Sequence, residues 1–400
     1  MCNVVFKKLL LVGIILMLTT VNSYIFSNPI LDRNGPGGRS ITAFDRIGQR
    51  SIGGYFDTEY VNVLDSDYTS SKSDSSSTFK AHRFILEVSS QVHEDILINS
   101  EIEFEYGGYV TNSASGVQKG EIKIEQAWLD YRVSELFVNR VGIILVPFGR
   151  VNVLHDSDVR EATQRPIYSS YIVPSTWMDT GVGFYGQKDI QDLELGYELY
   201  VFNGLADTSG STADDISLSE GIRKSRPNYK QDNNGSKAIA ARVEVSPSLG
   251  LNLGMSLYSG NYDDAGKNNL LLTGIDLFYK NGRYETLLEF AKAFIDNDGY
   301  SSIPAQMEGG YLEFRSHVLQ GYLRKKLPSL SKPVITLFSR LGYVNTDTVL
   351  NNTTVRYTLG FNFRPTESVV YKFEISQDDY RQVSETGYKT QFISSVAVGF

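Results

Sequence analysis

Apolar and polar residues alternate with a period of two along much of this chain. In DILINSEIEFEYGGYV (95–110), every second position from Ile98 is apolar or serine, and Asn99 and three glutamates lie between them. LELGYELYVFNG (193–204) and VRYTLGFNFRP (355–365) repeat the pattern. Because successive side chains of a strand point to opposite faces, each segment predicts a strand with one apolar and one charged face.

Two kinds of connection alternate between these segments. The short turns are predicted at 92–95, 134–136, 188–191, 246–250, 280–283, 327–332 and 364–368. The long polar loops are predicted at 64–77, 110–119, 147–179, 204–236, 260–268, 296–305, 346–353 and 378–388. Together they separate about 16 strands, and short turns on one rim with long loops on the other are typical of a transmembrane β-barrel. A soluble β-sandwich gives no reason for such sorting. We therefore predict an all-β fold, a single antiparallel transmembrane barrel.

The first residues, MCNVVFKKLLLVGIILMLTTVNS, have the pattern of a secretory signal peptide. Lys7 and Lys8 precede an apolar run from Leu9 to Val21, and small residues follow it. The alternative is an N-terminal membrane anchor, for which the run is short. We expect a signal peptide at 1–23, an irregular lead at 24–50 and the barrel at 51–400.

Composition and charge fit this interpretation. The 25 Tyr, 21 Phe and 35 Gly favour strands and tight turns. The mean hydropathy of −0.20 looks like that of a soluble protein, so the evidence for a membrane protein is the alternation. The net charge of −8 argues against nucleic acid as a partner.

The last nine residues, FISSVAVGF, place Phe392, Val396, Val398 and Phe400 on one face of a strand. In a closed barrel this face meets outer-membrane lipid, and the last strand pairs with the first so that no edge is left open. The alternative is a hydrophobic edge strand in a soluble protein. A strand that ends in phenylalanine also resembles the signal read by the outer-membrane assembly machinery, which predicts that role for Phe400.

The stretch 140–187 contains PFG at the end of one predicted strand, HD and RP in the following loop, and PSTW followed by TGVGFYG leading into the next strand. These motifs resemble bacterial outer-membrane porins of the phosphate-selective type. The resemblance is specific over about 48 residues and implies a porin of a Gram-negative-type bacterium with about 16 strands. It also implies a homotrimer and a third long loop folded into the lumen.

Loop 147–179 is unusual by its own composition. It carries an apolar set (Ile167, Tyr168, Ile172, Val173 and Trp177) that a loop in water has no use for. Pro147, Pro166 and Pro174 stiffen it. We expect it to pack against the inner wall and to set the bore. Its candidate constriction residues are Arg150, His155, Asp156, Asp158, Arg160 and Arg165.

Charged residues on the strands are expected to line the pore, since an Arg or Lys facing lipid at mid-depth costs about 2–4 kcal/mol. The acidic candidates are Glu101, Glu103, Glu105, Glu121, Glu125, Glu194 and Glu198, and the basic ones are Arg242, Arg340, Arg356, Arg364 and Lys372. This distribution predicts an acidic wall opposite a basic wall. For any one residue, the alternative role is only to solvate a water-filled interior. Phosphate selectivity needs a dense ladder of Arg and Lys, which the sequence lacks, so weak charge selectivity is predicted, with an anion- or phosphate-selective porin as the alternative.

One strand changes phase. In GEIKIEQAWLDYRV (120–133), Ile122 and Ile124 set one alternation, whereas Ala127, Leu129 and Tyr131 fit the opposite one. A β-bulge near Gln126 reconciles the two. The alternative is a strand assigned wrongly.

Other functions have weaker support in the sequence. GVGFYG (181–186) matches a dinucleotide fingerprint, but strand alternation follows it where a helix is needed. The HDSD motif (155–158) has metal-ligand residue types, yet a hydrogen-bonded loop is the simpler interpretation, so no metal or cofactor is predicted. An outer-membrane hydrolase and a surface adhesin remain alternatives. The main prediction is a porin, not an enzyme, that passes small hydrophilic solutes.

Overall fold

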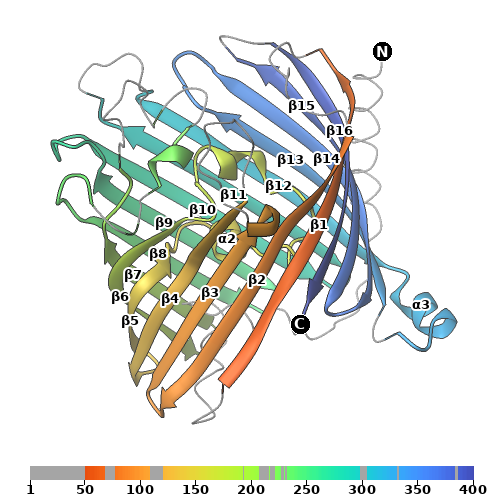
Figure 1. The fold of residues 1–400 in the computed structure, drawn as a ribbon, viewed down its shortest axis with the longest axis horizontal. Helices are drawn as coiled ribbons and strands as arrows, with labels where there is room; N and C mark the ends of the chain where they lie inside the picture. Colours follow the sequence, from red (N-terminus) through yellow and green to blue (C-terminus); the bar gives the residue numbers. More distant parts are fainter. Residues whose placement is uncertain are drawn as a thin grey trace.

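The computed structural model describes residues 50–67, 77–108, 120–191, 193–206, 216, 221–226, 229, 232–297, 304–330, 333–382 and 386–400. Within these ranges sixteen strands form one closed barrel (Figure 1), in which each strand pairs antiparallel with its sequence neighbours and β1 pairs with β16. The predicted fold class and strand number are therefore confirmed. The predicted signal peptide, and the lead except for Arg50, lie outside the described residues.

The strands are long and the helices short. The first eight strands are β1 (Arg50–Ser66), β2 (Ser77–His93), β3 (Ile96–Glu105), β4 (Glu121–Ser134), β5 (Phe137–Leu145), β6 (Met178–Ile190), β7 (Leu193–Phe202) and β8 (Ala238–Ser248). The other eight are β9 (Leu251–Asn261), β10 (Asn269–Asn281), β11 (Tyr284–Ile295), β12 (Gln306–Val318), β13 (Val334–Asn345), β14 (Thr353–Thr366), β15 (Val369–Arg381) and β16 (Thr386–Gly399). The α-helices are α2 (Arg150–Val153) and α3 (Gln320–Lys326), and the 3-10 turns are η3 (Tyr106–Gly108), η4 (Ile167–Ser170) and η5 (Arg223–Ser225). None of the helices in this part of the chain is long and apolar enough to cross a membrane.

The alternation of the sequence becomes the two faces of the barrel wall. On β3, Asn99, Glu101 and Glu103 are buried, whereas Ile98 is 39% exposed. On β7, Glu198 and Tyr200 are buried between more exposed apolar neighbours. Since the exposed apolar face of a barrel wall meets lipid, the buried polar residues face the interior.

The barrel closes where β1 meets β16. The register runs from Tyr55 opposite Gly399 to Ser66 opposite Lys389. Below this ladder, the N–H of Phe400 donates to the carbonyl of Gly54 at 3.0 Å, and the N–H of Gly54 donates back at 3.2 Å. The ring of Phe400 stacks on Phe84 with a centroid distance of 6.0 Å. The seam is therefore bonded as far as the last residue of β16, and Arg50–Gly53 of β1 pair with β2 alone.

The phase change in β4 is a bulge, as predicted. Glu101 lies opposite Gln126, but its neighbour Ile102 lies opposite Ile124, so Glu125 is the extra residue. Glu125 is buried and Gln126 half-buried, while Ile124 stays on the exposed face. The bulge thus keeps both apolar runs of the strand toward lipid.

Three connections differ from the predicted ones. The connection between β12 and β13 contains α3, where a turn at 327–332 was predicted. Leu319 ends the strand in a left-handed conformation with φ 59°, and QGYLRKK then forms the helix, which lies beyond the strand ends (Figure 1). The eighth loop shrinks from 378–388 to 382–385, and the third is 146–177 rather than 147–179. Strand ends that extend beyond the membrane need no apolar face, so the alternation of apolar and polar residues does not show where these strands end.

Candidate functional site

The interior of the barrel carries charged side chains that pair with one another across strands. Arg242 on β8 is 1% exposed; its Nη1 lies 2.6 Å from Asp276 on β10, and its Nη2 lies 2.6 Å from Glu244. Nη1 of Arg242 also donates to Ser256 on β9 at 2.8 Å. A guanidinium group with this many charge-assisted bonds is fixed in place and electrically compensated.

Two other arginines predicted on the basic wall, Arg340 and Arg356, are held in the same way. Arg340 on β13 lies 2.5 Å from Glu313 on β12, and Glu313 also bonds Arg315. Arg356 on β14 bonds both carboxylate oxygens of Asp378 on β15, at 2.5 and 2.7 Å. Each arginine is therefore paired with a carboxylate on its own or an adjacent strand.

The acidic candidates on β3 and β4 also have cationic partners. Arg83 on β2 lies 2.9 Å from Glu103 and 3.1 Å from Glu105, while Lys123 lies 2.5 Å from Glu103 and 3.5 Å from Glu125. Opposite charges are thus interleaved on this wall.

The predicted pore residues differ in exposure. Glu101, Glu103, Glu125, Glu198, Arg242, Arg340, Lys372, His155 and Arg160 are buried, whereas Glu105, Arg356, Arg364, Arg150, Asp156, Asp158 and Arg165 are half-buried. Glu121 and Glu194 are exposed near the strand ends.

The sequence prediction omitted several charged partners, namely Arg83, Lys123, Asp130, Arg140, Asp276, Glu285, Glu289, Glu313, Arg315, Glu374 and Asp378. Most of them alternate with apolar residues in stretches such as YETLLEFAKAF (284–294). The same period-two pattern, read along β2, β4, β5, β10, β11, β12 and β15, finds them.

The segment 146–177 contacts the buried face of the wall at widely separated strands. Its main chain donates from Gly149 to Ser256 on β9 and from Val151 to Glu289 on β11. Farther along, the N–H of Thr163 donates to Glu374 on β15 at 2.9 Å. Carboxylates of the wall therefore accept hydrogen bonds from loop amides that would otherwise be buried without a partner.

Apolar side chains of the same segment form part of the buried core. Tyr168 and Trp177 are fully buried; the ring of Trp177 lies 4.9 Å from Tyr258, and that of Tyr168 lies 5.9 Å from Tyr311. Gly309 on β12 permits this approach, because a Cβ there would lie 2.8 Å from the Cβ of Tyr168. Aromatic packing and main-chain bonds hold the segment together.

Several cations in and beside this segment have a different environment. Among the described residues no carboxylate oxygen lies within 4.0 Å of Arg160, Arg165 or the side-chain nitrogen of Lys372. Arg160 donates to the carbonyl of Thr163 at 2.6 Å, and Lys372 donates to the carbonyl of Ser157. Burial, together with the nearby Arg83 and Arg160, lowers the pKa of Arg165 well below its ordinary value.

Arg364, a predicted basic pore residue, and Arg150, a predicted constriction residue, also join the segment to the wall. Arg364 on β14 donates to the carbonyl of Asp158 at 2.9 Å and lies 3.5 Å from Glu161. The Arg150 guanidinium lies 4.6 Å from the ring centre of Phe278 and donates to Asn252 at 3.4 Å. These contacts tie the first half of the segment to the wall.

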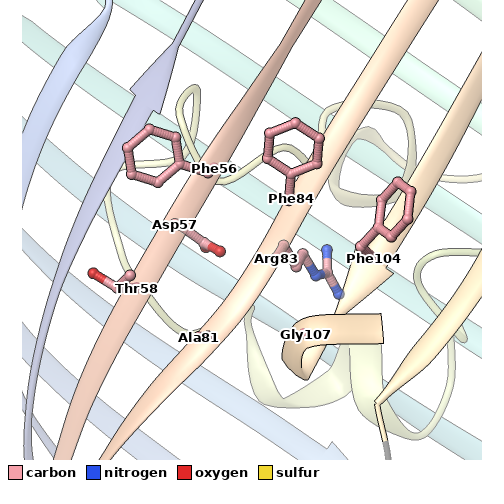
Figure 2. A pocket seen from close by; sticks show the side chains of 8 residues that line it. All are labelled: Phe56, Asp57, Thr58, Ala81, Arg83, Phe84, Phe104 and Gly107. Carbon is pink, nitrogen blue, oxygen red and sulfur yellow. The ribbon is translucent and has the colours of Figure 1, made fainter. Parts of the chain in front are cut away.

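A separate pocket of about 470 Å³ lies at β1, β2, β3 and η3. Figure 2 shows Phe56, Phe84 and Phe104 side by side on the three neighbouring strands. Phe56 and Phe84 are 40% and 42% exposed and belong to the apolar outer face. This pocket therefore opens toward lipid and is not part of the interior site.

Comparison with known proteins identifies the family. The sequence matches the family described as phosphate-selective porin O and P over residues 60–281, more than half of the chain. The chain belongs to this family. An uncharacterised protein of Aquifex aeolicus (strain VF5) is 30% identical to the porin over 290 residues, which is 68% of this chain. The porin spans 62% of the length of that relative.

Solved structures agree with the fold. An anion-selective porin from Comamonas acidovorans matches with a TM-score of 0.57 and 11% identity, covering 88% of this chain and 100% of the other. The outer membrane channel DcaP of Acinetobacter baumannii matches with a TM-score of 0.55 and 12% identity, over 88% and 98% of the two chains. The family and the barrel locate the porin in the outer membrane.

Proposed function

We propose that this porin lets small hydrophilic solutes and ions diffuse passively through the barrel, with weak charge selectivity. The observation that carries the proposal is the pairing of charges on the inner wall. Arg242, Arg340 and Arg356 each bond a carboxylate within 2.6 Å. A paired wall is polar enough to hold water and has little net potential to select ions.

The bore is set, in this proposal, by the segment 146–177. Support comes from its hydrogen bonds to side chains of β9, β11 and β15, which alternate with lipid-facing residues. Support also comes from its aromatic packing on Tyr258 and Tyr311. A segment that is bonded to distant strands of one barrel narrows the path between them. Because it is held at several points, thermal motion displaces it little.

Anion selectivity is the second candidate, because one observation favours it. Arg160, Arg165 and Lys372 have no carboxylate within 4.0 Å in the described structure, and Arg83 lies near Arg160 and Arg165. Cations without a carboxylate in direct contact attract a permeating anion. Anion selectivity is also what the name of the Comamonas acidovorans porin states for that protein.

Reversal potential in a planar bilayer under a salt gradient separates the two candidates. The refolded barrel should give discrete conductance steps and weak selectivity. Strong anion selectivity, with conductance blocked by phosphate, would favour the second candidate. A folded barrel without any conductance would contradict both, and would move attention to a surface adhesin or a barrel hydrolase.

Two further parts of the proposal rest on resemblance to porins. The barrel is proposed to assemble as a homotrimer, which native mass spectrometry in detergent tests directly. Phe400 is proposed to act as the signal for the assembly machinery. Phe400→Ala, which keeps both main-chain hydrogen bonds to Gly54, should then lower insertion in cells more than it lowers refolding into detergent. No catalytic step is part of the proposed function.

A further inference from the structure

One group of metal-ligand residues joins the segment 146–177 to the wall. His155 and Asp156 from the segment and Glu101 from β3 bring one potential ligand atom each within 4.8 Å of one another. Glu125, the bulge residue of β4, completes the group, with its Oε2 lying 3.8 Å from Nε2 of His155. The group therefore combines two residues of the segment with two strands of the wall.

The imidazole of His155 is oriented as in a metal ligand. Its Nδ1 donates to the carbonyl of Asn152 at 2.9 Å, which leaves Nε2 as the ring nitrogen that faces the carboxylates. His155 is 3% exposed, and Nε2 has no hydrogen-bond partner. A histidine ligand usually donates its other N–H to a carbonyl or carboxylate in this manner.

One carboxylate beside Nε2 also has an oxygen without a hydrogen bond. Glu125 accepts from Thr176 and contacts Lys123 through Oε1, while its Oε2 is buried without a hydrogen bond. Glu101 accepts from Gln126 through Oε2. Lys123 also bonds Glu103 and is thus shared between two carboxylates. Three carboxylates therefore lie around one imidazole.

We propose that His155, Asp156, Glu101 and Glu125 bind a divalent transition-metal ion that fastens the segment 146–177 to β3 and β4. Nε2 of His155 lies 3.6 Å from Oδ1 of Asp156 and 3.8 Å from Oε2 of Glu125. Ligands about 2.0–2.1 Å from a tetrahedral ion lie roughly 3.3–3.5 Å apart, so movements of a few tenths of an ångström bring His155, Asp156 and Glu125 around one ion. Glu101, whose ligand atom lies within 4.8 Å of those of His155 and Asp156, has farther to move.

The ligand set selects the class of ion. An imidazole with carboxylates suits Zn²⁺ and other first-row ions, whereas Mg²⁺ and Ca²⁺ prefer oxygen ligands alone. The ion enters beside Asp156, whose side chain is 19% exposed, more than the side chains of His155 and Glu125. Binding would neutralise this part of the wall and hold the segment against it.

The test is isothermal titration of the refolded, untagged barrel with ZnCl₂ at pH 7.5. We expect one Zn²⁺ per barrel, no competition from millimolar Mg²⁺ or Ca²⁺, and a change of the ¹⁵N shift of Nε2 of His155. His155→Gln and Asp156→Asn should each abolish stoichiometric binding. Asp156→Asn is the second variant because it alters a half-buried side chain and leaves the core intact.

Two other groups serve as matched controls. Asp57, Glu59 and His82 lie together on β1 and β2, and His93, Glu94 and Asp95 lie at the β2–β3 turn. His82→Gln and His93→Gln should leave Zn²⁺ binding unchanged. Binding that persists in His155→Gln, that disappears in either control, or that is absent from the wild-type barrel would overturn the proposal. None of these measurements depends on conductance, so the result stands apart from the proposed porin activity.

Discussion

Buried arginines of the barrel wall and of the segment 146–177 have different kinds of hydrogen-bond partner. On the wall, Arg242 lies one strand from Ser256 and two strands from Asp276, and sheet geometry brings them together. In the segment, Arg160 instead donates to the main-chain carbonyls of Ala162 and Thr163, which belong to the same segment. A sheet places side chains in register and can pair charges repeatedly, whereas a loop lacks that register. The segment has three arginines and three carboxylates, so we expect it to contribute charges that are not paired side by side rather than a net charge.

Breaking a charge pair of the wall should have the largest effect. Asp276→Asn leaves the buried Arg242 with only Glu244, and removing one partner of a buried pair typically costs about 3 kcal/mol or more. The unfolding midpoint in guanidinium, followed by tryptophan fluorescence in lipid vesicles, should fall accordingly. Arg381→Gln is the control, since Arg381 and Asp379 form an exposed pair and such pairs contribute little. Equal midpoints for the two variants would show that the wall pairs do not stabilise the barrel.

Adding a side chain where the segment touches the wall should come next. A Cβ at Gly309 would lie 2.8 Å from the Cβ of Tyr168 and 2.9 Å from the carbonyl of Tyr343. Overpacking of this kind costs about 1–3 kcal/mol, so Gly309→Ala should lower stability and change single-channel conductance. Gly321→Ala on α3 meets nothing within 4 Å and should change neither property. If Gly309→Ala keeps the wild-type conductance, the segment does not set the bore.

Removing an uncompensated cation should alter selectivity with little effect on stability. Arg165→Gln should shift the reversal potential toward cation selectivity. Two unit charges 4 Å apart in water interact by about 1 kcal/mol, which limits the change in permeability ratio to about fivefold. Arg381→Gln, at the rim, should not shift the potential. An unchanged potential in Arg165→Gln would mean that this cation does not face permeating ions.

Acid should weaken the attachment of the segment slightly. Burial tends to raise the pKa of Glu161, but Arg364, Arg315 and His317 outweigh it, so the pKa is lowered overall. The stabilisation is therefore present above the unfolded pKa of about 4.3 and is lost as the pH falls through the lower folded value. Stability measured from pH 6 to pH 3 should decline, and Glu161→Gln should remove part of that decline. An identical slope in the variant would exclude Glu161 as a contributor.

Much of the barrel could be predicted because its signals are local. Alternation along β3, β7 and β14 gave the strands and their faces, and the conflict between Ile124 and Ala127 gave the bulge. The strand ends were less predictable, since β15 and β16 continue with polar residues on both faces. The helix α3 was missed because only period-two alternation was sought. A helix of seven residues repeats every 3.6 residues and does not show that alternation.

The sequence by itself determined which side chains can face lipid, because a strand has only two faces and a charge in lipid is costly. Only the tertiary structure decided how the interior charges are paired. Arg242 and Asp276 are 34 residues apart, and His155 and Glu101 are 54 apart. Register between strands and the path of one segment bring such residues together. Both depend on the closure of the whole barrel, which no local stretch of the chain encodes.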